Sequence, residues 1–242
     1  MNSAALYQAL PLPQASKADP DSSVEMYPPT YSGVPSPVRL PWGLKPLGSA
    51  QTGVDQLPDG RDRYWIRHEV VRDVTPRMLA WWFTHLEGHV VVQGRRINRY
   101  RLWHPYDHVH ASYAKRCADG SIGPGAVIRL REVIGVNPKF GVDIHTTIEK
   151  IDEEGFIHNP VFHGISGLAR MEYTFKRVPG GTLYENCLVF GAKNMKLLQP
   201  ILRALAFPSG KGEAWLRHNV EEVGMLENFL PDLYRAETGL AE

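Results

Sequence analysis

Apolar positions near the end of the chain repeat with the period of an α-helix. The run from Gly212 to Tyr234 places its large apolar residues on one face of such a helix; they are Trp215, Met225, Leu226 and Phe229. His218 and Glu222 fall on the same face. Because a lone ionised carboxylate is expensive to bury, we expect Glu222 to be protonated, paired or bound to a cation. Side chains four residues apart on a helix can reach one ion, although this spacing also arises by chance.

The middle of the chain changes to the period of two that is typical of strands. A run rich in strand formers begins near Arg63, and a helix follows with Thr75 as its cap and Pro76 at its first position. Further strands are predicted at about 89–93, 96–103, 126–136, 142–151, 168–177 and 182–190. The last two join at a hairpin turn, and a helical stretch at 194–206 is interrupted at Pro200.

Strands joined by short turns, with little helix between them, predict an antiparallel sheet and an α+β fold. The late amphipathic helix must bury its apolar face, and the concave face of this sheet is the surface available to it. We therefore predict a helix-grip fold, in which the sheet wraps around the long C-terminal helix. A cavity between the two elements would suit a small apolar or aromatic ligand.

Prolines are concentrated at the N-terminus. The first 60 residues contain 10 of the 19 prolines, so this segment cannot form a continuous helix or a central strand. Its spaced aromatic residues suggest docking onto the body or onto a second subunit; they are Tyr7, Tyr27, Tyr31 and Trp42. We expect a proline-rich arm over residues 1–62, a single domain over residues 63–242, and a homodimer.

Composition narrows the class of protein further. Charged residues make up 22% of the 242 residues and the formal net charge is +1, so we expect neither nucleic acid nor a membrane as a partner. No apolar run approaches the roughly 20 residues that span a bilayer. The two cysteines are too few for a disulfide framework, and we expect a cytoplasmic protein in a reducing compartment.

Candidate metal ligands occur in two further places. Alternation along residues 126–134 puts Glu132 on an otherwise apolar strand face. The stretch from Tyr100 to His110 contains His104, His108 and His110 around Pro105. One imidazole from this stretch, with Glu132, His218 and Glu222, would form a four-ligand site of the kind that Zn²⁺ accepts. Asp107 is placed to orient a ligating imidazole, whereas a histidine beside proline and tryptophan is also a common packing residue.

These residues carry a family resemblance. The motif W-H-P-x-D-H at residues 103–108, an inward glutamate in a following strand and H-x-x-x-E in the last helix resemble the diacetylphloroglucinol hydrolase and phloretin hydrolase family over about residues 63–235. The resemblance implies a Bet v 1-like helix-grip fold and hydrolysis of the carbon–carbon bond between an acyl group and a phloroglucinol-type ring. It also implies a zinc site of two histidines and two glutamates, which correspond here to His108, Glu132, His218 and Glu222, with His104 as the competitor of His108.

The resemblance also suggests residues that act on the substrate, a small aromatic ketone. Tyr100 lies eight residues before His108, as the family's substrate tyrosine does, and we expect it to orient substrate hydroxyls. His104 and His163 are the candidates for proton transfer. Tyr184 and Asn186 share a strand face and either line the same cavity or only pack within the sheet. Two alternatives stay open, namely a carrier of aromatic ligands without catalysis and a zinc hydrolase of esters or other 1,3-dicarbonyl compounds.

Overall fold

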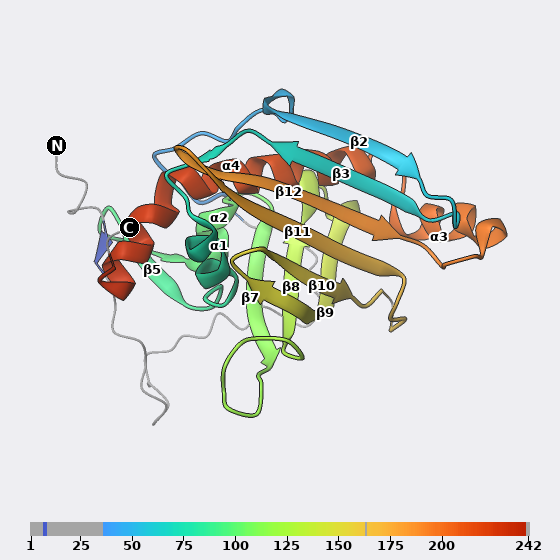
Figure 1. Cartoon of the computed structure of the whole chain (residues 1–242). Coiled ribbons are helices and arrows are strands. Elements are labelled where there is room, and N and C mark those ends of the chain that lie inside the picture. The colour runs from blue at the N-terminus through green and yellow to red at the C-terminus, as the bar shows by residue number, and fades with distance from the viewer. Residues whose placement is uncertain (1–6, 9–35, 163, 241–242) are drawn as a thin grey trace.

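The computed structural model describes residues 7–8, 36–162 and 164–240. Their fold is α+β: one large antiparallel sheet curves around the long helix α4 (Lys211–Thr238), which crosses the concave face of the sheet (Figure 1). This is the helix-grip arrangement predicted from the late amphipathic helix. The cavity of the protein lies between the sheet and this helix.

Nine strands form the large sheet within the described residues. They are β2 (Ala50–Gln56), β3 (Asp62–His68), β4 (Val71–Arg72), β7 (His108–Lys115), β8 (Val127–Val133), β9 (Gly141–Asp152), β10 (Gly155–Pro160), β11 (Ala169–Val178) and β12 (Gly181–Phe190). Their order is β2-β3-β12-β11-β10-β9-β8-β7, with β4 also paired to β12. The predicted turn at Gly180 joins β11 and β12 as a hairpin.

Helix α4 is amphipathic as the sequence predicts. It follows Gly210, whose φ of 83° is readily adopted only by glycine, and it ends at Gly239. Its buried face includes the four predicted apolar residues together with His218 and Glu222. The apolar side chains pack against the inner face of the sheet and against helix α1 (Pro76–Phe83), where Trp82 meets Phe229 edge to face. The Thr75 side chain accepts a hydrogen bond from the Met78 N–H and caps α1 as predicted.

The chain before Arg63 contributes more to the fold than the sequence predicted. Strand β2 lies within the predicted arm, and it pairs with β3 at the edge of the sheet. Residues 50–56 contain no proline, which explains why a strand forms there. Trp42 and Leu44 pack against the core of the domain, and the Lys45 ammonium lies 3.0 Å from Glu227 of α4.

Several predicted elements differ in the structure. Strand pairing of 96–103 ends at Asn98, whose side chain accepts hydrogen bonds from the next backbone N–H groups and starts helix α2 (Arg99–Trp103). Tyr100 therefore lies on a helix, and the prediction of a strand over all of residues 96–103 was wrong. Strands β7 and β10 were not predicted at all.

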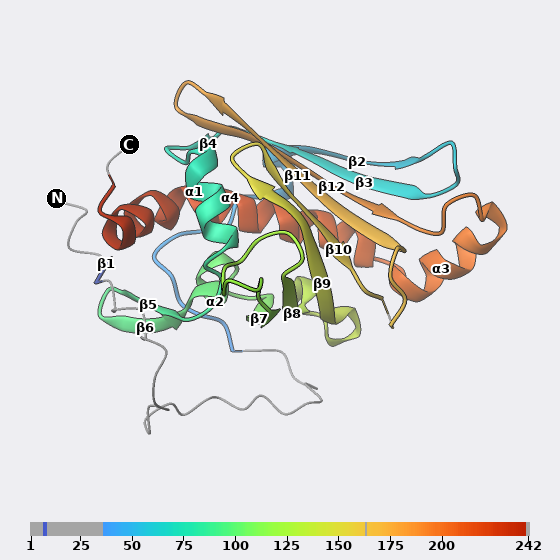
Figure 2. The same ribbon diagram turned by 60° about the horizontal axis from the view of Figure 1, so that its bottom comes forward.

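A small sheet and helix α3 (Gln199–Ala206) lie at opposite ends of the molecule (Figure 2). This small separate sheet contains β1 (Tyr7–Gln8), β5 (His89–Val92) and β6 (Arg95–Asn98). Helix α3 precedes α4 and has Pro200 in its first turn, where the sequence predicted an interruption. Short 3₁₀ helices are η2 (Leu47–Ser49), η3 (Ile134–Val136), η4 (Pro138–Phe140) and η5 (Lys196–Leu198). None of the described helices combines the length and apolar character needed to cross a membrane.

Candidate metal centre

A cavity separates α4 from the inner face of the sheet. Its volume is about 850 Å³ when the open mouth is included. The walls are mostly apolar and aromatic, with contributions from α1, α2, the strands β8 to β12 and the start of α4. The predicted apolar face of residues 128–134 lines it, and Glu132, His218 and Glu222 lie in the same wall.

Four side chains converge beside this cavity. His108 Nε2 lies 3.3 Å from Glu222 Oε2 and 3.9 Å from Glu132 Oε1. His218 Nε2 lies 3.7 Å from Glu222 Oε2 and 4.0 Å from Glu132 Oε2. Two imidazole nitrogens and two carboxylates around one point form a donor set that Zn²⁺ accepts. The structure thus brings together all four residues of the predicted metal set.

Local structure explains this convergence. His108 and Glu132 stand directly opposite each other in the register of β7 and β8. Opposed residues in an antiparallel pair have their Cβ atoms about 5 Å apart, so both side chains reach the same side of the sheet. His218 and Glu222 are one turn apart on α4, which lies across that face.

Each imidazole is oriented through its Nδ1 atom. His108 Nδ1–H donates to the Tyr100 carbonyl at 2.7 Å, and His218 Nδ1–H donates to Asp107 Oδ2 at 2.9 Å. Both rings therefore direct Nε2 to the centre, and in the neutral form each offers its Nε2 lone pair there. His108 Nε2 is buried and has no hydrogen-bond partner, which is costly for a nitrogen lone pair unless a cation binds it. The donor set and this unpaired atom therefore fit a divalent metal.

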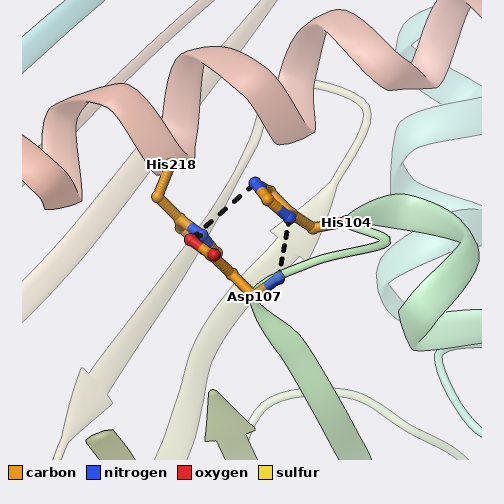
Figure 3. A group of neighbouring side chains, drawn as sticks. All are labelled: His104, Asp107 and His218. Atoms are coloured by element: carbon orange, nitrogen blue, oxygen red, sulfur yellow. Dashed lines mark hydrogen bonds and ion pairs between the residues drawn. The ribbon is translucent and has the colours of Figure 1, made fainter. Parts of the chain in front are cut away.

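Asp107 supports the centre as the sequence predicted. Figure 3 shows the Asp107 side chain reaching the His218 ring, with the His104 ring beside them. It also accepts hydrogen bonds from the backbone N–H groups of Gly135 at 2.7 Å and Val136 at 3.1 Å. Although burial raises the pKa of Asp107, the hydrogen bond from His218 and the nearby imidazoles outweigh burial and lower it. Asp107 thus remains an acceptor that fixes the His218 ring.

His104 lies behind the centre instead of in it. Its Nδ1 accepts from the Asp107 N–H at 3.1 Å, so the proton of the neutral ring is on Nε2, which donates to Glu221 at 3.2 Å. The ring stacks on His218 with centroids 4.7 Å apart. His104 is not among the described residues that line the cavity. Its proposed proton transfer stays a prediction without support from this geometry, and of the two histidines only His108 points its free nitrogen at the carboxylates.

Burial and charge control the protonation of the centre. Burial raises the pKa of Glu222 to about 8, although the charge of His218 opposes this. Burial lowers the pKa of His218, but the hydrogen bond to Asp107 and the charges of Glu222 and Glu132 outweigh it and raise the pKa to about 10. Burial holds the pKa of His108 well below its usual range. Without a metal, protons on Glu222 and His218 offset the buried negative charge, and a cation would replace them.

Tyr100 connects the centre to the cavity. Its hydroxyl donates to Glu132, and its ring stacks on His108 with centroids 3.7 Å apart. Burial and the charges of Glu132 and Glu222 raise the pKa of Tyr100 well above its usual value, so the hydroxyl keeps its proton. Tyr100 also lines the cavity, which agrees with a role in contacting a ligand.

The other predicted residues lie in different places. His163 is outside the described residues. Tyr184 is buried beside Tyr173 and does not line the cavity. Asn186 points to the inner face of the sheet, where it donates to Asn219 of α4 at 2.8 Å, but it does not line the cavity either. These two are packing residues of the sheet, which was the other alternative that the sequence left open.

Sequence reasoning missed several polar groups of the cavity. His158 and Thr146 line it and share a hydrogen bond of 2.6 Å between His158 Nδ1 and Thr146 Oγ1. His158 lies on β10, the strand that was not predicted. Alternation in the run Phe156, His158, Pro160 was the available signal, because all three residues line the cavity. Lys211, at the start of α4, was missed as well.

Fold and site together define a helix-grip protein with a candidate metal centre in its ligand cavity. The model of the DAPG hydrolase PhiG domain matches residues 45–136. This range contains Tyr100, His108 and Glu132 and ends before α4. The match supports the resemblance to the diacetylphloroglucinol hydrolase family over this part of the chain.

Other comparisons concern sequence and fold. Curated protein sequences gave no match. A protein structure from Rhodobacter sphaeroides is 13% identical with a TM-score of 0.44, over 75% of this chain and 99% of that one. The structure of Ara h 8.0201 is 14% identical with a TM-score of 0.38, over 69% and 98% of the two chains. A START superfamily protein from Mycobacterium smegmatis is 14% identical with a TM-score of 0.41, over 67% and 98%.

Proposed function

We propose that this protein is a zinc-dependent hydrolase that cleaves the carbon–carbon bond between an acyl group and a polyhydroxylated aromatic ring. One observation carries the proposal: His108 and His218 direct their Nε2 atoms at Glu132 and Glu222 beside an apolar cavity. The family match over residues 45–136 supports the reaction class.

The substrate's own chemistry makes this bond hydrolysable. When a phloroglucinol-type ring takes its keto form, the bond to the acyl carbon becomes that of a β-diketone. Water then adds to the acyl carbonyl, the bond to the ring breaks, and the ring carbon takes a proton. The products are a carboxylic acid and the deacylated ring. A bound Zn²⁺ would supply Lewis acidity towards a substrate oxygen and the attacking water.

The protein's residues bind and orient the reactants. The Tyr100 hydroxyl, which keeps its proton, can donate to a substrate oxygen in place of Glu132. Aromatic walls, including Phe156 and Trp215, hold the ring and exclude bulk water, which strengthens each polar contact inside. Asp107 keeps His218 in the tautomer that directs Nε2 inward.

The carrier alternative explains the cavity but not its polar wall. A protein that only holds an aromatic ligand has no need for a buried and a partly buried carboxylate beside His108, whose Nε2 is left without a hydrogen bond. Burying such groups without a cation is unfavourable. A zinc hydrolase of esters or other 1,3-dicarbonyl compounds would use the same residues, and only substrates distinguish it.

A substrate screen with the zinc-loaded protein tests the proposal. Acylphloroglucinols, dihydrochalcones and aryl esters are incubated with the wild type and with Glu222→Gln, and the products are identified by mass spectrometry. We expect a carboxylic acid and a deacylated ring from the first two classes. The rate of Glu222→Gln should be lower than that of the wild type by a factor of about 10² or more. Hydrolysis of esters alone would replace the proposed reaction, and binding without any hydrolysis would favour the carrier.

A further inference from the structure

Lys211 is a cation in the wall of an otherwise largely apolar cavity. It is the first residue of α4, and the cavity-lining residues of this helix follow it at helical spacing, namely Trp215, His218, Asn219 and Glu222. His218 comes seven positions after Lys211, which corresponds to roughly 10 Å along a helix axis. Lys211 therefore faces the ligand space about two turns before the candidate metal centre.

Among the described residues, the ammonium group of Lys211 forms no hydrogen bond or ion pair. Lys45, by contrast, is paired with Glu227 in the second half of α4. Phe207 and Trp215 lie in the same wall. Burial lowers the pKa of Lys211, and the charge of Glu132 opposes this only in part. A half-buried cation beside aromatic walls is best compensated by an anion that enters the cavity.

We propose that Lys211 binds an ionised hydroxyl group on the aromatic ring of the ligand. The inference rests on the proposed function and names the form of its substrate. Acyl groups withdraw electrons from a polyhydroxylated ring and make its hydroxyl groups acidic, so the ring readily carries a negative charge. The start of a 28-residue helix favours negative charge, and the lysine adds a full positive charge at the same place.

In this position Lys211 also affects the reaction, because it can stabilise negative charge on the ring. When the bond between the ring and the acyl carbon breaks, its electron pair is left on the ring before a proton is taken up. A cation held at the ring stabilises that charge. The acyl group would then lie towards the metal centre and the ionised hydroxyl towards Lys211, which sets one orientation of the ligand in the cavity.

Equilibrium binding to the zinc-loaded protein tests this inference without any turnover. The probes are 4-nitrophenol, at a pH where it is ionised, and 4-nitroanisole, the neutral methyl ether of the same shape. Dissociation constants are measured by quenching of tryptophan fluorescence for the wild type, Lys211→Met, Lys211→Arg and the exposed-residue control Lys176→Met. Melting temperature and zinc content are measured for each protein.

We expect Lys211→Met to bind the nitrophenolate at least about 10-fold more weakly, since the variant loses a charged hydrogen bond to the phenolate oxygen. Lys211→Arg should stay close to the wild type, and the affinity for 4-nitroanisole should be the same in all four proteins. If Lys211→Met loses affinity equally for both probes, Lys211 has a structural role. If its nitrophenolate binding is unchanged and its zinc binding is tighter, Lys211 only offsets the charge of Glu132. Either result overturns the inference. If nitrophenolate binding depends on Lys211 but no acylphloroglucinol is hydrolysed, the proposed reaction is rejected and the inference about Lys211 stands.

Discussion

At the scale of single residues, the metal centre depends on which imidazole nitrogen is free. His108 and His218 each use Nδ1 for a hydrogen bond and present Nε2 to the carboxylates. His104 has the opposite arrangement, because its Nδ1 accepts from the backbone and its Nε2 donates to Glu221. Replacing either histidine of the W-H-P-x-D-H stretch should therefore change a different property of the protein.

His108→Ala should lose zinc, because one of four ligands disappears. We expect the affinity for zinc to fall by orders of magnitude and activity to return in part with excess Zn²⁺. His104→Ala should keep its zinc and lose stability, by about 2–4 kcal/mol, since a buried, hydrogen-bonded ring is replaced by a cavity. Zinc titration and urea unfolding of both variants, with the exposed His145→Ala as control, measure this. Zinc loss in His104→Ala with retention in His108→Ala would reverse the assignment.

Asp107→Asn tests the support of the centre. The amide keeps the shape of the side chain but offers only one oxygen to His218 and to the backbone N–H groups of Gly135 and Val136. We expect zinc affinity to fall about 10- to 100-fold while the protein remains folded. A competition titration with a chromophoric chelator measures it, and Asp143→Asn on the outer part of the sheet is the control. Unchanged affinity in Asp107→Asn would mean that His218 does not need this carboxylate.

Sequence patterns predicted three of the four metal residues, because the periods of helix and strand determine which way their side chains point. The spacing of His218 and Glu222 places both on one face of any helix, and alternation places Glu132 on the inner face of its strand. The choice between His104 and His108 depended on the family spacing, because a hydrogen bond between one nitrogen and a distant carbonyl is invisible in a sequence. The helix at Tyr100 was missed for a related reason, since Asn98 caps it within a run that otherwise favours a strand.

At the scale of elements, buried polar contacts join neighbouring strands in the wall of the cavity. His158 of β10 bonds to Thr146 of β9 at 2.6 Å and approaches the Tyr173 hydroxyl of β11 at 3.4 Å. The pattern predicted β9 and β11 but not β10, because β10 is short and ends in proline. Strand β7 was missed because Pro105 and three histidines suggested a turn over a stretch where the strand in fact begins at His108.

His158 should make the free energy of unfolding depend on pH. Burial lowers its pKa to about 3, below the value of about 6.5 in an unfolded chain. Between these values the unfolded state binds a proton that the folded state does not, so stability is fully present above pH 6.5 and is lost as the pH falls. The contribution is about 2 kcal/mol between pH 7 and pH 5.

Urea unfolding at pH 7 and pH 5 measures this dependence. His158→Gln should lose about 2 kcal/mol less than the wild type between the two values, because the amide does not titrate. His145→Gln, at an exposed histidine of β9, should behave like the wild type. Equal acid sensitivity of His158→Gln and the wild type would show that the ring is not kept neutral by the fold.

At the scale of the whole molecule, the N-terminal segment is joined to the domain near the candidate site. The Val38 N–H donates to the Pro105 carbonyl at 3.1 Å, and Trp42 packs against the core. Aromatic residues spaced along a proline-rich segment predicted such docking, but the sequence offered no means of locating the contact. Strand β2 extends the same segment into the sheet.

Truncation tests this attachment and the proposed homodimer. Removing residues 1–20 should change little. Removing residues 1–50 takes away Val38, Trp42 and the contact of Lys45 with Glu227, and we expect the free energy of unfolding to fall by about 3 kcal/mol or more. Thermal melting and the mass in solution are measured for both truncations. Unchanged melting and mass after the longer deletion would show that the segment is only a tether.

The most direct test of the account is the zinc content of four proteins. The four proteins are the wild type, His218→Ala, Glu222→Ala and the control Glu185→Ala. Each is equilibrated with one equivalent of Zn²⁺, separated from free metal and analysed for zinc by mass spectrometry. Circular dichroism confirms that each protein is folded. We expect about one zinc per chain in the wild type and in Glu185→Ala, and less than about a tenth of that in His218→Ala and Glu222→Ala. A folded His218→Ala protein with full zinc content would contradict the proposed metal centre.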